Sequence, residues 1–224
     1  MEKVAIKSCG IVEYGQMSEK MRVLQRERIE GKIGDTLIFV EHPEIVTIGP
    51  KAIREDIQVE GYPTSITDRG GGITWHGPGQ IVVYPIIKWR TEEQSVRGII
   101  GKLEDWAIAA MSGCGIDAYK DPVMQGAWVD GFKVCSIGLS FLHWVSRHGM
   151  SINIDTPGNR VENLEGCGIG RGSHTSLARL GYHADPSGNK IDSKMIQDGL
   201  IETCEEILGR KPTEYSGQTR EIAA

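Results

Sequence analysis

Cys167 is the residue whose setting most clearly suggests chemistry. It lies in the run Gly166-Cys167-Gly168-Ile169-Gly170-Arg171-Gly172, in which glycine occupies alternate positions. Such a run predicts a loop, and an accessible loop is a poor place for a cysteine that serves only as a small core residue. A thiol reacts as a nucleophile in its thiolate form, which needs a cationic or basic neighbour. The sequence therefore suggests Cys167 as a nucleophile and requires a partner for it.

Lys133 is the second unusual residue. It follows the dipeptide Asp130-Gly131, which favours a type I′ turn, and it begins the predicted strand 132–139. A charge in this apolar strand either faces solvent by alternation or is desolvated for a purpose, and alternation alone favours solvent exposure. No G-x-S-x-G or H-E-x-x-H pattern competes with the thiol for a catalytic role.

A second glycine-rich run covers residues 69–80, and 29 of the 224 residues are glycine, roughly twice the usual share. Each run is either a tight structural loop or a ligand cradle, and both interpretations stay open at this point. Neither run is a Walker loop, and the run at 166–172 lacks the G-x-G-x-x-G spacing because its glycines fall on alternate positions, so the case for phosphate binding is weak. His76, next to Gly77, is expected to be a structural hydrogen-bonding residue rather than a base.

Composition excludes several classes of protein. The chain has 25 Lys and Arg against 30 Asp and Glu, a net charge of −5, which argues against a binder of nucleic-acid phosphates. Residues 131–180 hold five basic and three acidic side chains, so an acidic partner could dock there through Arg147, Arg160, Arg171 and Arg179, unless these arginines pair with Asp155, Glu162 and Glu165.

Cysteine usage and hydropathy narrow the class further. Five widely spaced cysteines fit neither a disulfide framework nor a zinc site, and Cys114, Cys135 and Cys204 are expected to be buried in apolar runs. No apolar stretch reaches membrane-spanning length, and the first residues do not resemble a signal peptide. The cytoplasm is therefore the expected location.

The predicted elements must place Lys133 and the glycine-rich runs around one core. A helical stripe covers 17–29, strands are expected at 36–40, 45–48 and 150–154, and a last helix covers 192–208. Thr91-Glu92-Glu93-Gln94 matches a capping box for a helix that ends at Gly113. This order predicts one α/β (α+β) domain over 1–224, with its motifs within about 36–180 and a mixed or antiparallel sheet flanked by helices.

Four ordered blocks carry a family resemblance. They are Asp68-Arg69-Gly70-Gly71 through Trp75-His76-Gly77-Pro78-Gly79-Gln80 with Tyr84-Pro85, then 129–138, then His148-Gly149-Met150-Ser151-Ile152-Asn153, and finally Cys167-Gly168 with Thr175-Ser176-Leu177. Together they resemble the octanoyltransferases of lipoate biosynthesis. The chain departs from the family pattern at Gly72, Trp75, Met150-Ser151 and Gly166, positions that concern shape or tunnel lining and so affect chain-length preference more than mechanism.

The resemblance implies a fold similar to lipoate and biotin protein ligases. It also implies that Cys167 takes an octanoyl group from acyl carrier protein, that Lys133 holds the thiolate and relays the proton, and that the acceptors are lipoyl domains of 2-oxoacid dehydrogenase E2 subunits and the glycine cleavage H protein. A monomer without cofactor or metal is expected. The residues implied to line the acyl tunnel are Arg69, Gly70, Gly71, Gly72, Ile73, Thr74, Trp75, His76, Ser136, Ile137, Gly138, Gly149, Met150 and Ser151.

Three other functions stay open from the sequence. An ATP-dependent lipoate or biotin protein ligase of the same fold would also use a glycine-rich loop and a lysine, but would not need a nucleophilic cysteine. An octanoyl amidotransferase acting between lipoyl domains would use one. A non-catalytic acyl- or protein-binding module would have no need for both Cys167 and Lys133.

Overall fold

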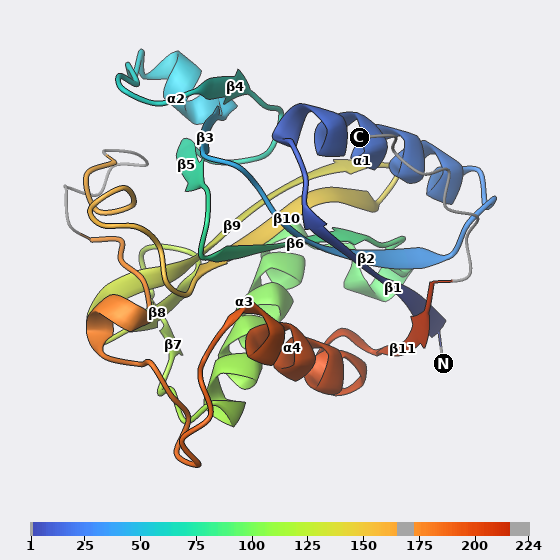
Figure 1. Cartoon of the computed structure of the whole chain (residues 1–224). Coiled ribbons are helices and arrows are strands. Elements are labelled where there is room, and N and C mark those ends of the chain that lie inside the picture. The colour runs from blue at the N-terminus through green and yellow to red at the C-terminus, as the bar shows by residue number, and fades with distance from the viewer. Residues whose placement is uncertain (1, 165–172, 216–224) are drawn as a thin grey trace.

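A computed structural model describes residues 2–164 and 173–215 of the chain. Its largest feature is an eight-stranded sheet in the order β11-β1-β2-β6-β10-β9-β8-β7 (Figure 1). β1 pairs in parallel with β2 and β11, and the other strand pairs of this eight-stranded sheet are antiparallel, so the sheet is mixed as expected. The strands are β1 (Glu2–Ile11), β2 (Asp35–Glu41), β6 (Gln80–Ile86), β7 (Tyr119–Lys120), β8 (Ala127–Val129), β9 (Phe132–Leu142), β10 (Val145–Asn153) and β11 (Arg210–Glu214).

Helices cover both faces of this sheet, which confirms the expected architecture. α1 (Tyr14–Ile29) lies on one face, and α3 (Val96–Gly113) and α4 (Ser193–Leu208) lie on the other (Figure 1). β6 is buried on both faces because its alternate side chains point to opposite sides of the sheet. Val82 packs into the hydrophobic core under α1, and Val83 packs into the hydrophobic core under α3 and α4. Among the described helices, none is long and apolar enough to cross a membrane.

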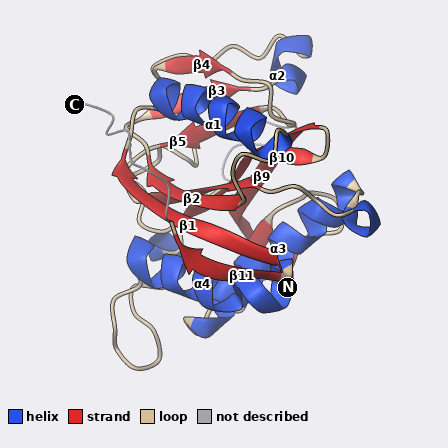
Figure 2. Cartoon of the chain, turned by 90° about the vertical axis from the view of Figure 1, so that its right-hand side faces the viewer, coloured by secondary structure: helices blue, strands red, loops and turns tan. Residues whose placement is uncertain are grey.

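A small sheet in the order β4-β3-β5 forms a separate layer. It contains β3 (Ile45–Ile48), β4 (Thr64–Ile66) and β5 (Ile73–His76), and with α2 (Pro50–Arg54) it lies beside α1 (Figures 1 and 2). The backbones of the two layers are in direct contact, since Gly70 N–H donates to Leu139 O on β9 at 2.9 Å. A Cβ on Gly138 would lie 2.8 Å from Gly70 O, so this crossing requires glycine at position 138.

The predicted helix at 17–29 and the strands near 36–40 and 45–48 are present as α1, β2 and β3. Asp130 and Gly131 have φ of 50° and 83°, the left-handed pair that a type I′ turn requires. β10 begins at Val145, earlier than the predicted residue 150, because it pairs with β9 from Leu142 back to Cys135.

The predicted start of the second long helix is wrong. Thr91–Glu93 forms a separate 3₁₀ turn, η1, and α3 begins at Val96, where the Ser95 hydroxyl accepts from Gly98 N–H at 3.2 Å. Glu93 does accept from the Arg90 backbone N–H, as in a capping box, but the same carboxylate also binds Arg210 of β11. That distant partner holds residues 91–93 in a separate turn.

Candidate active site

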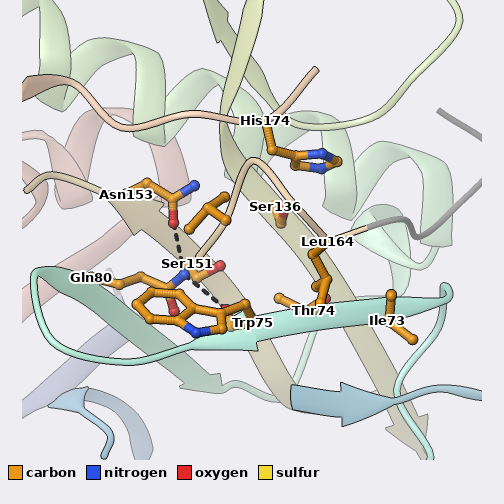
Figure 3. A pocket seen from close by; sticks show the side chains of 10 residues that line it. Ile73, Thr74, Trp75, Gln80, Ser136, Ser151, Asn153, Leu164 and His174 are labelled. Atoms are coloured by element: carbon orange, nitrogen blue, oxygen red, sulfur yellow. Dashed lines mark hydrogen bonds between the residues drawn. The ribbon is translucent and has the colours of Figure 1, made fainter. Parts of the chain in front are cut away.

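Two adjoining cavities lie between the small sheet and the large one. The first, the Tyr14 cavity, is lined by Tyr14, Arg69, Thr74, His76, Val82, Tyr84, Ser136, Ile137, Gly138, His148, Gly149, Met150 and Ser151. The second, the His174 cavity (Figure 3), is lined by Ile73, Thr74, Trp75, Gln80, Ser136, Ser151, Asn153, Val161, Leu164 and His174. Thr74, Ser136 and Ser151 belong to both linings, so the two cavities share a boundary of small polar side chains.

Most of the residues that the resemblance implies for the tunnel lie at these cavities. All of these except Arg69 lie on β5, β9 and β10, and the facing pairs Ser136–Ser151 and Gly138–Gly149 bring the two central strands to the same cavity wall. Gly70, Gly71 and Gly72 are not among the described residues that line either cavity. Their carbonyls and N–H groups instead bind Gly49, Lys51 and Leu139, which fits the interpretation of this run as a tight structural loop.

Several lining residues were missed by the sequence reasoning. Gln80, Tyr84, His148 and Asn153 stand inside the motif blocks and could have been included on that ground. Tyr14 is the first residue of α1 and has no local signal, since it reaches the cavity only because α1 begins beside it. His174 precedes the Thr175-Ser176-Leu177 element and was likewise missed.

Lys133 is buried, with 7% of its surface exposed, so the exposure favoured by alternation is wrong. Residues 173–175 act as an additional strand beside it: Lys133 N–H donates to Ser173 O at 2.8 Å, and Thr175 N–H donates to Lys133 O at 3.1 Å. On another side Gly126 packs against the lysine stem. Alternation within β9 could not reveal this cover, because it comes from distant parts of the chain.

Cys167 lies outside the described residues. Leu164 and Ser173, the described residues that flank it in the sequence, both contribute to the site, Leu164 by lining the His174 cavity and Ser173 by binding the backbone of Lys133. The three cysteines that were expected to be buried, Cys114, Cys135 and Cys204, are buried. Burial raises the pKa of the Cys135 thiol to about 12, although the nearby Lys133 lowers it, so Cys135 remains a thiol.

A charged cluster borders the Tyr14 cavity. The Asp68 carboxylate accepts hydrogen bonds from the Arg147 guanidinium and from His148 Nε2 at 2.8 Å. Burial raises the pKa of Asp68, but the hydrogen bond from His148 and the charge of Arg147 outweigh it and hold this pKa below its usual value. Burial lowers the pKa of His148 to about 4 despite the carboxylate. Asp68 is therefore an anion at neutral pH, and His148 is a neutral donor.

Hydrogen bonds connect the two cavities. His76 Nδ1 is 2.7 Å from Gln80 Oε1, and Asn153 Nδ2 donates to Thr175 O at 3.0 Å. Between them, Gln80 Nε2 donates to Asn153 Oδ1 at 2.7 Å (Figure 3). Burial, together with the charge of His42, lowers the pKa of His76 to about 3. A neutral His76 that is hydrogen-bonded to Gln80 fits the structural role expected for it.

Three of the four arginines proposed for docking lie within the described residues, and each of them forms an ion pair. Arg147 binds Asp68 and is buried, while Arg160 binds Glu44, so their partners differ from the acidic residues considered from the sequence. Arg179 pairs with Glu162 at 3.2 Å, as the alternative interpretation expected. Arg171 lies outside the described residues. Among the described residues, no group of three His, Cys, Asp or Glu side chains is arranged to hold a metal ion.

Solved structures share this fold. Over 98% of this chain and 89% of the other, the chain superposes on a bipartite lipoate protein ligase from Thermoplasma acidophilum with a TM-score of 0.71 at 11% identity. A biotin protein ligase from Aquifex aeolicus superposes with a TM-score of 0.50 at 11% identity, over 93% of this chain and 69% of that one. These likenesses confirm the expected fold class.

Sequence relatives are closer. An octanoyltransferase from Syntrophobacter fumaroxidans is 32% identical over 198 residues, 85% of this chain and 86% of that protein. An octanoyltransferase from Rubrobacter xylanophilus is 33% identical over 210 residues, 89% of this chain and 91% of that protein. The model of the lipoyl protein ligase A/B catalytic domain matches residues 14–197, a range that holds both cavities and Lys133. The chain therefore belongs to the octanoyltransferase family, within the lipoyl protein ligase A/B catalytic domains.

Proposed function

We propose that this protein transfers an octanoyl group from acyl carrier protein, through a thioester on Cys167, to a lysine of lipoyl-domain proteins. The observation that carries the proposal is the burial of Lys133 on β9, where residues 173–175 pair with its backbone and His174 lines the adjacent cavity. A buried ammonium is costly unless an anion or a reaction uses it, and a thiolate is such an anion.

In the first half-reaction the Cys167 thiolate attacks the thioester carbonyl of the carrier. The new C–S bond forms, the bond to the pantetheine sulfur breaks, and that sulfur leaves with the electron pair and takes a proton from the Lys133 ammonium, which becomes a neutral amine. The exchange of one thioester for another is nearly isoenergetic, so no ATP is required. The Lys133 ammonium stabilises both the attacking Cys167 thiolate and the departing pantetheine thiolate.

In the second half-reaction the amine of the acceptor lysine attacks the acyl-cysteine. The C–N bond forms, the C–S bond breaks, and the electron pair returns to the Cys167 sulfur. One amine proton must leave, and Lys133, which is a neutral amine after giving up its proton in the first half-reaction, can accept it. One residue thus holds the thiolate and later relays the proton.

The Tyr14 cavity is the proposed site for the hydrocarbon tail. Val82, Ile137 and Met150 supply apolar wall, and Gly138 and Gly149 leave the sheet surface between them without side chains. The residues shared by both cavities then separate the tail from the reacting carbonyl, which lies on the Lys133 side.

An ATP-dependent ligase is the less favoured alternative. The lipoate and biotin ligases match at about a tenth identity and share the fold, whereas the relatives that match at about a third identity are octanoyltransferases. An octanoyl amidotransferase that takes its acyl group from another lipoyl domain uses the same two half-reactions, and the choice of donor distinguishes it.

The test is the intact mass of the protein after incubation with octanoyl-acyl carrier protein in the absence of ATP. Wild type and a Cys9→Ala control should gain one octanoyl group, and Cys167→Ala should gain none. An adduct that survives in Cys167→Ala, or that maps to Cys135, overturns the assignment. A faster adduct from an octanoylated lipoyl domain than from the carrier would identify the amidotransferase instead.

A further inference from the structure

His174 is firmly held beside Lys133. The residues on either side of it bind the Lys133 backbone, so the two residues form a parallel bridge. Thr175 O also accepts from Asn153 Nδ2 at 3.0 Å, and Leu177 N–H donates to Asn153 O at 3.0 Å. The backbone that carries the imidazole is therefore fixed to both central strands of the sheet.

The imidazole shares a side of the sheet with the lysine and faces the cavity. Residues paired across a bridge place their side chains on the same side. Figure 3 shows the His174 ring at one end of its cavity, beyond Ser136, while Thr74 and Trp75 of β5 close the other side. Within the described part of the chain, its one hydrogen-bond partner is the Ser173 hydroxyl, 3.4 Å from Nδ1, near the limit of hydrogen-bond distance.

The imidazole is uncharged. Burial, and then the charge of Lys133, lowers the pKa of His174 to about 4. Among the described elements around the cavity, Lys133 carries the charge that shifts the pKa of His174. The other polar lining residues, Thr74, Gln80, Ser136, Ser151 and Asn153, do not ionise. A neutral ring in this position can accept a hydrogen bond, whereas both nitrogens of an imidazolium are donors and neither can accept.

We propose that His174 is a substrate-binding residue of the second half-reaction, where it accepts a hydrogen bond from the attacking amine nitrogen of the acceptor lysine. The inference rests on the proposed function and deepens it. A neutral amine has two N–H groups, of which one proton leaves to Lys133 as the C–N bond forms. The other N–H stays in the product amide and points to His174, which aims the nitrogen lone pair at the acyl carbonyl.

This role predicts that the two half-reactions respond differently to substitution. The carrier thioester has no amine at its reacting centre, so acylation of the enzyme does not use His174. Aminolysis does, and the loss of one hydrogen bond from a buried polar group should slow it by about tenfold to a hundredfold. A glutamine at the position retains an acceptor oxygen and should restore part of the rate.

The experiment measures each half-reaction alone. Wild type, His174→Ala, His174→Gln and a control, His183→Ala in the exposed loop after η2 (Ala178–Leu180), are mixed with octanoyl-acyl carrier protein, and octanoyl-enzyme formation is followed by intact mass. The isolated octanoyl-enzymes are then mixed with an unmodified lipoyl domain, and amide formation is followed over a range of domain concentrations.

The expected result is acylation within about twofold of wild type for all four proteins, with slow transfer at saturating lipoyl domain for His174→Ala, partial recovery for His174→Gln and no change for His183→Ala. Transfer by His174→Ala at the wild-type rate, or an equal slowing of acylation and transfer, overturns the inference. Failure of the proposed function looks different, because wild type would then form no octanoyl-enzyme at all.

Discussion

Gly126 and Lys133 are in direct contact. A Cβ on Gly126 would lie 2.7 Å from Lys133 Cε and 2.2 Å from the Cys135 carbonyl oxygen. The buried Glu104 carboxylate of α3 fixes this arrangement, because its Oε1 accepts from Gly126 N–H at 2.8 Å. The position of the lysine ammonium therefore depends on the absence of a side chain at residue 126.

Gly126→Ala should lower octanoyl-enzyme formation on the order of 10²-fold, because the added methyl group displaces the lysine stem. The substitution also strains the backbone, since φ is 130°, and should cost about 1–3 kcal/mol of stability. Gly131→Ala is the matched control: φ there is 83° with no atom within 4 Å of the added Cβ, so it strains the backbone without a collision. Equal turnover of the two variants would contradict the role assigned to this contact.

Lys133→Ala should lower overall transfer by at least about 10²-fold, the usual loss for a general acid or base. Lys133→Arg should recover little, since guanidinium keeps the charge but does not release its proton at usable pH. Steady-state rates with octanoyl-acyl carrier protein and a lipoyl domain measure both. Near-normal turnover by the arginine variant would show that Lys133 acts through its charge alone.

Ser136→Leu should narrow the boundary between the two cavities, because Ser136 lines both. Turnover of an eight-carbon donor should fall at least about tenfold relative to that of a four-carbon donor, which needs less of the Tyr14 cavity. Rates for donors of four, eight and sixteen carbons give the comparison. Equal turnover of the four- and sixteen-carbon donors by wild type would contradict a closed tail site. Gly71→Val is a poorer test, because φ at Gly71 is 95° and a side chain there is strained whatever the space.

Glu93 links η1 to β11 far from the cavities. Burial raises its pKa, but hydrogen bonds from Arg210, Arg90 and Lys102 outweigh this and hold the pKa well below the ordinary value. The native pKa is thus lower than the unfolded one, so the contribution of Glu93 to stability is present above about pH 4.3 and is lost as pH falls below it. Unfolding by urea between pH 6 and pH 3 should show a shallower loss of stability in Glu93→Gln than in wild type. The exposed neighbour variant Glu92→Gln should follow wild type.

Arg210 is a buried residue whose removal should lower the free energy of unfolding more than the removal of most other residues. Its side chain is fully buried and binds Glu93 and Asp35, which are themselves buried. Arg210→Ala removes the cation that joins these two carboxylates, while Arg90 and Lys102 remain on Glu93 and Arg28 remains on Asp35. The substitution should therefore cost about 3 kcal/mol, the lower end for a broken buried ion pair, measured by urea unfolding at pH 7. A loss below about 1 kcal/mol, the value of an exposed pair, would show that the network is not acting as a buried one.

Local sequence patterns predicted the elements whose structure depends on interactions between residues close in the sequence. The hairpin at Asp130-Gly131 follows from the turn preference of two residues, and α1 follows from its apolar stripe. Lys133 shows the limit of such reasoning, since its burial comes from residues 173–175 and Gly126. The same holds for Tyr14, which lies near the start of the chain and is distant in sequence from the other residues that line the cavity.

The glycine-rich run shows a different limit. Its composition fits both a ligand cradle and a tight loop, because glycine permits close backbone approach in either case. Gly49 decides between them for residues 70–72: its N–H donates to Gly72 O at 2.9 Å, and a Cβ there would lie 2.5 Å from Gly71 O. The neighbour that the glycines accommodate is another segment of the protein, which only the fold could reveal.

The chain of hydrogen bonds from His76 to Thr175 has one allowed direction. A backbone carbonyl can only accept, so Asn153 must present its NH₂ to Thr175 O and its oxygen to Gln80. Gln80 then donates to that oxygen and to Trp75 O, which leaves its own oxygen to accept from His76. His76 must carry its single proton on Nδ1, and its Nε2 is an acceptor that faces the Thr47 hydroxyl at 3.5 Å. One backbone carbonyl beside Lys133 thereby sets the tautomer of an imidazole in the wall of the other cavity.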